Sequence, residues 1–366
     1  MLWDGELKKF GCRISPKGTK AFILLLASGK RHTIGRYPTI SLAEARTEAK
    51  RIFAEVTLGT YQQESFTLSV DECAEQFQKT REQRTKASTA AEYKRVLKKH
   101  FLPALGRKPI GDVTTRDVVK LIERLIPTPG ECFHAFVAVK TFFTWATRQG
   151  LCATNPCERI QAPTKLISRD RFLTDTELAA VLSAAHAIGY PHGTIVELLA
   201  LTGQRRGEIA ALRWDWINHE NKTITLPAAI TKNNRQHTFP YGETVAAVLA
   251  KMPRLSTLLF PARGRDDVPF SGWSKSKKAF DETCDISAWV LHDLRRTFAT
   301  NLAALGTPIH VTEKLLNHVS GTMSGIVAVY QRHNYMEEMR AAILAWEQRL
   351  SDILALHAPE PDKVTL

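Results

Sequence analysis

The chain has 366 residues, of which 44% are hydrophobic and 24% are charged. That length favours two or three domains, each able to bury a core of its own. No apolar run approaches the roughly 20 residues needed to cross a bilayer, and the N-terminus lacks the basic-then-apolar order of a signal peptide. The formal net charge is +13. We therefore expect an intracellular, cytoplasmic protein that binds a polyanion. DNA is the first candidate, although a ribosomal or membrane-surface protein would carry a similar charge.

The cysteines indicate neither disulfides nor a metal site. They are scattered along the chain without metal-ligand spacing, and in a reducing compartment we expect them to be free thiols. We assign the cysteines no role, and we expect neither a metal nor a cofactor. The six cysteines are Cys12, Cys73, Cys132, Cys152, Cys157 and Cys284.

Residues 1–62 are expected to form a first small domain, with three strands followed by one helix. Ser41 and Glu44 have the spacing of a capping box, which predicts a helix from there to Gly59. Eleven Lys and Arg against five Asp and Glu in residues 1–60 leave a surplus of six positive charges. The predicted strands, separated by turn signals rich in Gly, Pro and Ser, are Phe10–Ile14, Ala21–Leu26 and Arg31–Ile34.

Residues 66–160 are expected to be helical. Capping boxes are predicted at Ser69–Glu72 and Thr89–Glu92, and apolar residues recur near helical spacing within Val113–Leu125. Basic residues crowd the first part of this region, and such a run is usually a solvated face. The basic residues are Lys79, Arg81, Arg84, Lys86, Lys94, Arg95, Lys98 and Lys99.

A third domain is expected over residues 170–350, followed by a tail at 351–366. A capping box at Thr174–Glu177 opens this domain. Further along, Ile195–Leu201 is an apolar, helix-like run that Gly203 interrupts.

An arginine and a lysine of the third domain lie where predicted elements are interrupted, one at a helix end and one at a hairpin turn. The interruption at Gly203 would expose Arg205 at a bend rather than bury it along a regular helix face. The runs Thr223–Leu226 and His237–Pro240 predict a hairpin with Lys232 at its turn.

The stretch from His292 to Tyr330 carries two imidazoles, a guanidinium and a phenol. His292 and Arg295 lie three positions apart, so on a helix they share a face. Alone, such a pair is most often a solvated polar face, and a single tyrosine is most often a core or surface aromatic. Together with Arg205 and Lys232 upstream, the set is more specific.

Six residues of the third domain follow one another in the order typical of one enzyme family. They resemble the active site of the tyrosine recombinase (phage-type integrase) family. The resemblance implies an enzyme that cleaves and rejoins DNA without a metal ion or ATP. The six residues are Arg205, Lys232, His292, Arg295, His318 and Tyr330.

The chemistry explains why these residue types are needed together. Two arginines, here Arg205 and Arg295, can neutralise a phosphodiester transition state through bidentate hydrogen bonds. A phenol with a pKa of about 10 is a poor nucleophile at neutral pH, so Tyr330 needs a proton acceptor, which His292 can provide. Lys232 can protonate the departing deoxyribose oxygen as a general acid.

Two further roles come from the resemblance alone. It implies that His318 donates a hydrogen bond to the scissile phosphate and that Glu208 holds the site in shape. It also implies a multidomain fold that is mainly α with small β-sheets. The fold would comprise a three-stranded sheet plus helix, a helical bundle and a mixed α/β catalytic domain.

The N-terminal motifs Asp4–Gly11, Gly35–Pro38 and Ser41–Arg46 resemble the arm-type DNA-binding domain of prophage and genomic-island integrases. In that domain a three-stranded sheet lies in the major groove. The helical region that follows matches the family's core-binding domain. Its basic residues would contact phosphates and set position and salt dependence. The expected DNA contacts are Arg13, Lys20, Lys30, Arg31, Arg36, Lys79, Arg84, Lys86, Lys94, Arg95 and Lys98.

Two tyrosines follow His318, and only one can face the site if their segment is helical, because five residues turn a side chain by a net angle of about 140°. Tyr330 matches the nucleophile position of the family. Tyr335 leads into an amphipathic helix predicted over Met336–Leu350, which could pack on its own domain or dock on a neighbouring protomer.

The implied partners are double-stranded DNA, at core and arm attachment sites, and further copies of the chain as a tetramer. An excisionase and a host DNA-bending protein are the accessory factors to expect. Integration of a prophage or genomic island is the leading function, and excision stays open. The alternatives are a type IB topoisomerase, a non-catalytic DNA-binding regulator of the same fold, and, with least support, a metal nuclease.

Overall fold

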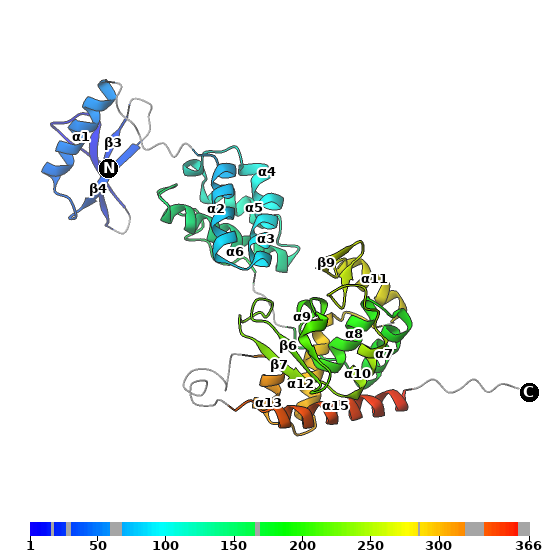
Figure 1. The fold of residues 1–366 in the computed structure, drawn as a ribbon. Helices are drawn as coiled ribbons and strands as arrows, with labels where there is room; N and C mark the ends of the chain where they lie inside the picture. The colour runs from blue at the N-terminus through cyan, green and yellow to red at the C-terminus, as the bar shows by residue number, and fades with distance from the viewer. Residues whose placement is uncertain are drawn as a thin grey trace, which may run out of the picture. The chain divides into compact units, whose positions relative to one another are not determined.

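The computed structural model separates into two compact units, Met1–Ser168 and Arg169–Leu366 (Figure 1). Its described residues bury three hydrophobic cores. One core lies in the first 60 residues, one in the helical region that follows, and one in the second unit. Among the described residues no helix is long and apolar enough to cross a membrane. The structure describes residues 1–15, 18–26, 31–58, 68–164, 169–284, 286–318 and 333–357.

The N-terminal sheet has four antiparallel strands in the order β1-β2-β3-β4. All three predicted strands are confirmed, but the expected three-stranded sheet was wrong, because Leu2 and Trp3 add a short fourth strand beside Cys12 and Gly11. A Cβ on Gly11 would lie 2.5 Å from the Leu2 carbonyl oxygen, so only glycine lets this strand approach. Two residues are too few to show alternation in a sequence. The strands are β1 Leu2–Trp3, β2 Phe10–Ile14, β3 Lys20–Leu25 and β4 Arg31–Tyr37.

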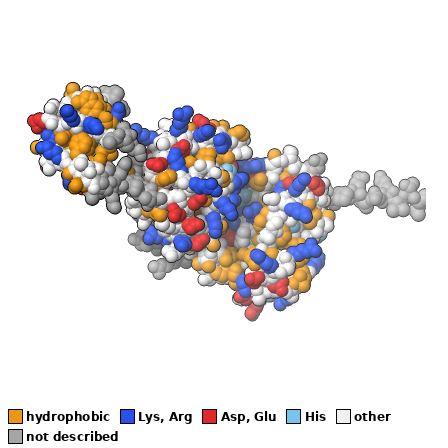
Figure 2. All heavy atoms as spheres, turned by 90° about the horizontal axis from the view of Figure 1, so that it is seen from above, with side chains coloured by type: hydrophobic (Ala, Val, Ile, Leu, Met, Phe, Trp, Pro, Cys, Tyr) orange, Lys and Arg blue, Asp and Glu red, His pale blue; other side chains and the backbone are white. Residues whose placement is uncertain are grey.

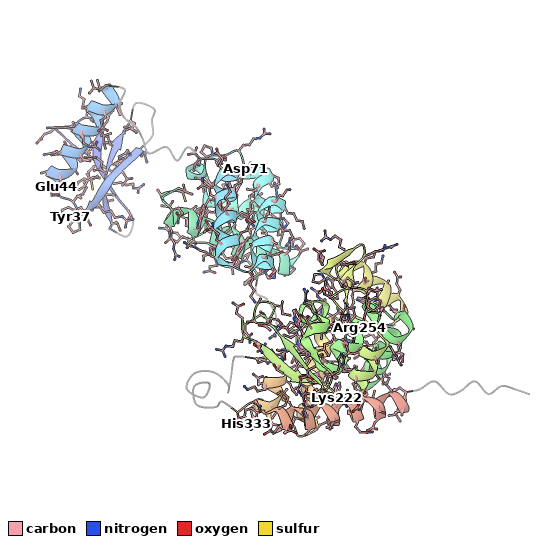
Figure 3. All side chains as sticks on the ribbon, in the orientation of Figure 1. Tyr37, Glu44, Asp71, Lys222, Arg254 and His333 are labelled. Atoms are coloured by element: carbon pink, nitrogen blue, oxygen red, sulfur yellow. The ribbon has the colours of Figure 1, made fainter. Side chains whose placement is uncertain are left out.

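One helix, α1 (Leu42–Thr57), covers part of this sheet. The predicted capping box is confirmed: the Glu44 amide donates to Ser41 Oγ at 3.3 Å, and the Ser41 amide donates to the Glu44 carboxylate at 2.8 Å. Tyr37 and Glu44 mark the connection from β4 into this helix (Figure 3). The buried helix residues Ala45, Ala49 and Ile52 pack on the phenylalanines and leucines of β2 and β3.

The helical region is a bundle centred on Phe77, which is fully buried. The rings of Tyr93, Phe142 and Trp145 surround Phe77 at centroid distances of 5.6, 5.5 and 5.4 Å. The elements are α2 Val70–Arg84, α3 Ala87–Val96, the π-helix η1 Leu97–Phe101, α4 Leu102–Leu105, the 3-10 helix η2 Ile110–Asp112, α5 Thr115–Glu123 and α6 Pro129–Arg148.

The helix starts in this bundle were partly predicted. The capping box at Ser69–Glu72 is confirmed. The one at Thr89–Glu92 was wrong: α3 begins at Ala87, so Thr89 lies inside its first turn and its amide donates to the Lys86 carbonyl at 2.9 Å. An unpredicted box at Thr114–Asp117 begins α5.

The second unit packs helices around a small sheet of order β5-β6-β7, with a separate β8-β9 hairpin. The predicted hairpin strands and the break at Gly203 are confirmed. The elements are α7 Asp175–Ile188, α8 His192–Thr202, α9 Arg206–Ala210, the 3-10 helix η3 Trp214–Trp216, β5 Ile217–Asn218, β6 Thr223–Leu226, β7 His237–Pro240, α10 Glu243–Lys251, β8 Pro261–Ala262, β9 Arg265–Pro269, α11 Trp273–Thr283, α12 Leu291–Ala304, α13 Ile309–Leu315 and α15 Met336–Leu356.

The last helix, α15, packs on its own domain. Trp346 is fully buried, its indole Nε1 donates to the Ala200 carbonyl at 3.0 Å, and its ring meets that of Phe298 at 5.7 Å. The tail expected from residue 351 was wrong for its first part, because the helix continues to Leu356. The remainder of the expected tail, residues 358–366, lies outside the described residues.

Gly203 is where the fold of the second unit constrains a residue most tightly. It ends α8 with a φ of 64°, and a Cβ there would lie 2.5 Å from the Phe298 ring and 3.1 Å from Leu316. A left-handed conformation costs a non-glycine residue about 1–2 kcal/mol, and the overlap adds to that cost.

We therefore predict that Gly203→Ala lowers the free energy of unfolding by at least about 2 kcal/mol, measured by urea denaturation. Gly207→Ala is the control, since a Cβ at Gly207 meets nothing within 4 Å. Equal stability of the two variants would contradict this account of the α8 terminus.

Candidate active site

Arg205, Arg295 and His318 lie together at the carboxyl end of α13. The last carbonyl groups of a helix have no partner within it, and this end of the helix carries partial negative charge. Here the carbonyls of Leu315, Leu316 and Asn317 all accept hydrogen bonds from side chains outside the helix. We call these three groups the α13 carbonyls.

Arg295 is the more deeply buried of the two candidate arginines, with 4% of its surface exposed. Its Nη1 donates to the Gly203 carbonyl at 2.8 Å, and its Nη2 donates to the Leu316 carbonyl. Burial, with Arg205 nearby, lowers the pKa of Arg295 to about 9, so the group still carries its charge at neutral pH. No carboxylate among the described residues forms an ion pair with Arg295, and its charge therefore remains available to an anion.

Arg205 lies at the bend between α8 and α9, with 21% of its side chain exposed. Its Nη1 donates to Glu208 Oε1 at 3.1 Å, and its Nη2 donates to the Asn317 carbonyl at 3.5 Å. Glu208 is itself buried, so Arg205 has one fixed carboxylate beside it, while part of the Arg205 side chain reaches solvent. The two arginines are thus held by adjacent α13 carbonyls.

Lys232 and His292 line one surface hollow together with Arg205. His292 lies on the first turn of α12, which is capped by Asp293, whose carboxylate accepts the Val290 amide at 2.9 Å. Partial burial and the nearby arginines lower the pKa of His292, which favours the neutral ring that can accept a proton. Lys232 is exposed on the turn between β6 and β7.

His318 directly follows the α13 carbonyls. Its Nδ1 is 3.0 Å from Glu313 Oε1, and 35% of its side chain is exposed. Tyr330 lies outside the described residues. Tyr335 caps the start of α15, with its ring 4.9 Å from that of His310. Among the described residues, no group of three or more His, Cys, Asp or Glu is placed to hold a metal ion.

The residues that support this arrangement were not found from the sequence. Gln204 Nε2 and His237 Nε2 both donate to the Leu315 carbonyl, at 2.8 and 3.1 Å. Asn233 bonds to Asn317 across 84 residues of chain. Gln204 and Asn233 stand next to predicted residues, but nothing in the sequence indicates their partners.

The expected DNA contacts of the helical bundle lie at its surface, where Lys and Arg side chains are interspersed with Asp and Glu (Figure 2). Lys86 is half-buried, and the others are exposed. Arg95 is not a free cation, because it pairs with Glu92 at 2.7 Å and with Glu131 at 2.8 Å. Arg95 therefore ties α3 to α6, and a phosphate would have to compete with two carboxylates for it.

His237 makes the unfolding free energy of the second unit depend on pH. Burial lowers the pKa of this histidine to about 4, from an ordinary value of about 6.5. The folded protein thus binds the proton less readily than the unfolded chain. The contribution of neutral His237 to the free energy of unfolding is fully present above pH about 6.5 and is lost as the pH falls toward 4.

We predict a loss of up to about 3 kcal/mol of unfolding free energy over that range from this one group. His237→Gln should reduce the pH dependence in denaturant titrations between pH 7 and 4, whereas a substitution at exposed His219 should not. An unchanged slope in His237→Gln would show that the imidazole is not buried in its neutral form.

Three family models match successive parts of this chain. The Arm DNA-binding domain matches residues 1–65, the Phage integrase central domain matches 70–163, and the Phage integrase family matches 171–337. Together the three models span nearly the whole described structure.

Individual proteins agree with these matches. The chain is 29% identical to the prophage integrase IntZ of Escherichia coli, over 93% of this chain and 89% of that protein. It is 30% identical to the tyrosine recombinase XerC of a Mycobacterium species, over 50% of this chain and 65% of that protein. A lambda integrase dimer bound to a COC′ core site has the same fold, with a TM-score of 0.56 at 19% identity, over 91% of this chain and 97% of that chain. The chain therefore belongs to the phage integrase family of site-specific tyrosine recombinases.

Proposed function

We propose that this integrase inserts a prophage or genomic island into DNA through a 3′-phosphotyrosine formed on Tyr330, and that excision is the reverse use of the same chemistry. The observation that carries the proposal is the pair of guanidinium groups, Arg205 and Arg295, held on adjacent carbonyls. Arg205 lines a hollow together with Lys232 and His292.

The two arginines would stabilise the phosphoryl transition state. Two N–H groups of Arg295 already donate to carbonyls. In Arg205, one nitrogen donates to Glu208 and another donates to a carbonyl. The remaining N–H groups can bond the non-bridging oxygens, and no carboxylate in the described part of the chain forms an ion pair that would cancel the charge of Arg295. Because both groups are fixed before substrate arrives, little reorganisation opposes the reaction.

The proton transfers would be divided between His292 and Lys232. The phenol oxygen of Tyr330 attacks phosphorus and gives its proton to the neutral His292 ring. The bond between phosphorus and the 5′-oxygen breaks, and Lys232 Nζ gives that oxygen a proton. The products are a phosphotyrosyl ester and a 5′-hydroxyl group. Attack by another 5′-hydroxyl reverses the steps, so the ester conserves the bond and no ATP is needed.

His318 and Glu208 would act as supporting groups. Glu313 Oε1, at 3.0 Å from Nδ1 of His318, would accept a hydrogen bond from that nitrogen and orient the ring so that Nε2 faces the phosphate. Glu208 would keep Arg205 at the bend through its 3.1 Å ion pair.

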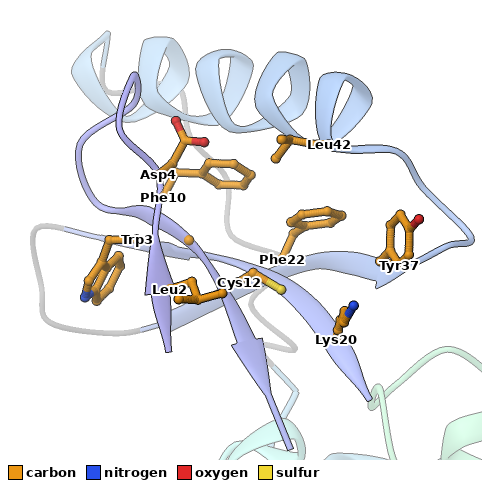
Figure 4. Close-up of a pocket in the computed structure, with 10 residues that line it drawn as sticks. Leu2, Trp3, Asp4, Phe10, Cys12, Lys20, Phe22, Tyr37 and Leu42 are labelled. Atoms are coloured by element: carbon orange, nitrogen blue, oxygen red, sulfur yellow. The ribbon is translucent and has the colours of Figure 1, made fainter. Parts of the chain in front are cut away.

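The N-terminal sheet would bind the arm sites through the face that α1 leaves open. Residues paired across neighbouring strands lie on the same face of a sheet. Arg13 and Arg36 both pair with Ala21, so all three lie on one face, the one away from α1. Lys20 lies on the other face, beside Tyr37, where it lines a pocket between the sheet and the start of α1 (Figure 4). Arg31 lies at the start of β4, and Lys30 is outside the described residues.

The proposal extends to domains, partners and location. Residues 1–62 would bind arm sites, 66–160 and 170–350 would enclose the core site, and four copies would pair two sites. An excisionase and a host DNA-bending protein would set direction, and the enzyme would act in the cytoplasm on the nucleoid.

Formation of the covalent adduct tests the proposed nucleophile. On a nicked substrate that carries the core site, Tyr330→Phe should bind DNA and form no adduct, because the attacking oxygen is missing. Tyr335→Phe should still form one, since Tyr335 packs at the start of α15. Peptide mapping should place the ester on Tyr330. Cleavage by Tyr330→Phe, or an adduct on Tyr335, would refute the assignment.

Binding of the isolated arm site tests the proposed face of the sheet. Arg13→Ala and Arg36→Ala should each weaken binding and reduce the slope of log K against log salt concentration by about 1. Lys20→Ala should change neither quantity appreciably, because its side chain lies on the opposite face. If Lys20→Ala instead has the larger effect in fluorescence anisotropy titrations, the helix side of the sheet meets the DNA.

A further inference from the structure

Two asparagines join the turn that carries Lys232 to the end of α13. Asn233 Nδ2 donates to Asn317 Oδ1 at 2.7 Å and to the Asn317 carbonyl at 3.3 Å. In the other direction, Asn317 Nδ2 lies 3.4 Å from Asn233 Oδ1. We call this contact the asparagine pair. It connects the residue after Lys232 with the residue before His318.

The turn also has hydrogen bonds of its own. Thr231 Oγ1 donates to the Ala228 carbonyl at 3.1 Å, and the Arg235 amide donates to Asn233 Oδ1 at 3.2 Å. These bonds hold the shape of the turn but do not fix its place on the domain. The asparagine pair connects the turn to the end of α13.

Asn317 also binds one of the two arginines, Arg205. Its carbonyl, which accepts Asn233, also accepts Arg205 Nη2 at 3.5 Å. Its backbone has a φ of 50°, a left-handed conformation that asparagine tolerates better than most residues. One residue therefore meets the Lys232 turn, a candidate arginine and, through the chain, His318.

We propose that the asparagine pair is a positioning element that places Lys232 for proton transfer to the leaving 5′-oxygen. This inference rests on the proposed role of Lys232 as general acid. A lysine side chain has a flexible four-carbon stem, and a proton donor must come within hydrogen-bond reach of its target. Anchoring the adjacent residue to the element that holds Arg205 restricts the backbone from which this stem swings.

A substrate with sulfur in place of the 5′-bridging oxygen separates proton donation from other roles. The thiolate leaves without needing a proton, because thiols are far more acidic than alcohols. A defect in general acid catalysis therefore disappears on this substrate, whereas a defect in phosphate binding, nucleophile activation or folding remains.

The test compares single-turnover cleavage of the oxygen and sulfur substrates by the full-length protein. Asn233→Ala removes the amide group that donates to Asn317, and Asn317→Gly removes the Asn317 side chain while keeping the left-handed backbone accessible. Each should slow cleavage of the oxygen substrate by about 10- to 100-fold and of the sulfur substrate by less than about threefold. The double variant should be no slower than either single one, since the pair acts as a unit.

Asn234→Gly is the matched control within the turn. Asn234 also has a positive φ, of 56°, and its side chain makes no hydrogen bond to any described residue. This variant should cleave both substrates at nearly the unaltered rate. A loss as large as that of Asn233→Ala would show that general loosening of the turn is responsible, and would overturn the positioning role.

The remaining outcomes separate this inference from the proposed function. Lys232→Ala should be rescued by sulfur, and if it is not, the general acid assignment itself fails. If Lys232→Ala is rescued but the asparagine variants are equally slow on both substrates, the pair supports the arginines or His318 instead. Unchanged cleavage of the oxygen substrate by Asn233→Ala would likewise refute the inference.

Discussion

The arrangement of this site depends on hydrogen bonds from buried cations and amides to the α13 carbonyls. A buried guanidinium is expensive unless its donors are satisfied, and an ion pair with a carboxylate would satisfy them while cancelling the charge. Carbonyl groups at the negative end of a helix satisfy donors without cancelling the formal charge. Arg295 is held in this way. The site thus combines fixed geometry with retained positive charge, which is what binding a phosphodiester requires.

Local sequence patterns predicted several of the strands and helices in this fold. The hairpin strands Thr223–Leu226 and His237–Pro240 were predicted residue for residue, because alternation and flanking turn residues are local properties. The capping box at Thr89 failed for a local reason too: spacing alone cannot distinguish a helix start from the first turn of a helix that began two residues earlier. The strand at Leu2–Trp3 depends on Gly11, a contact between separate segments.

The candidate site shows the same division between local and long-range information. Arg205 was expected at a bend, since an apolar run ends at Gly203, and the structure has it there. The bonds from His237 and Gln204 to the Leu315 carbonyl could not be predicted, because they join segments 78 and 111 residues apart. Likewise, the basic residues of α3 could be named from the sequence, but pairing of Arg95 with Glu131 could be learned only from the structure.

The packing of α15 on its own domain affects when the second unit can fold during synthesis on the ribosome. The buried Trp346 bonds to a carbonyl of α8, the helix that ends beside Arg205, and packs on Phe298 of α12, the helix that carries His292 and Arg295. Domains fold as they are synthesised, N-terminal ones first. The sheet and the bundle can therefore form while the second unit still lacks its last helix. A nascent chain that has not yet reached α15 would have the first unit in place without a completed core in the second, so DNA cleavage would require synthesis through α15.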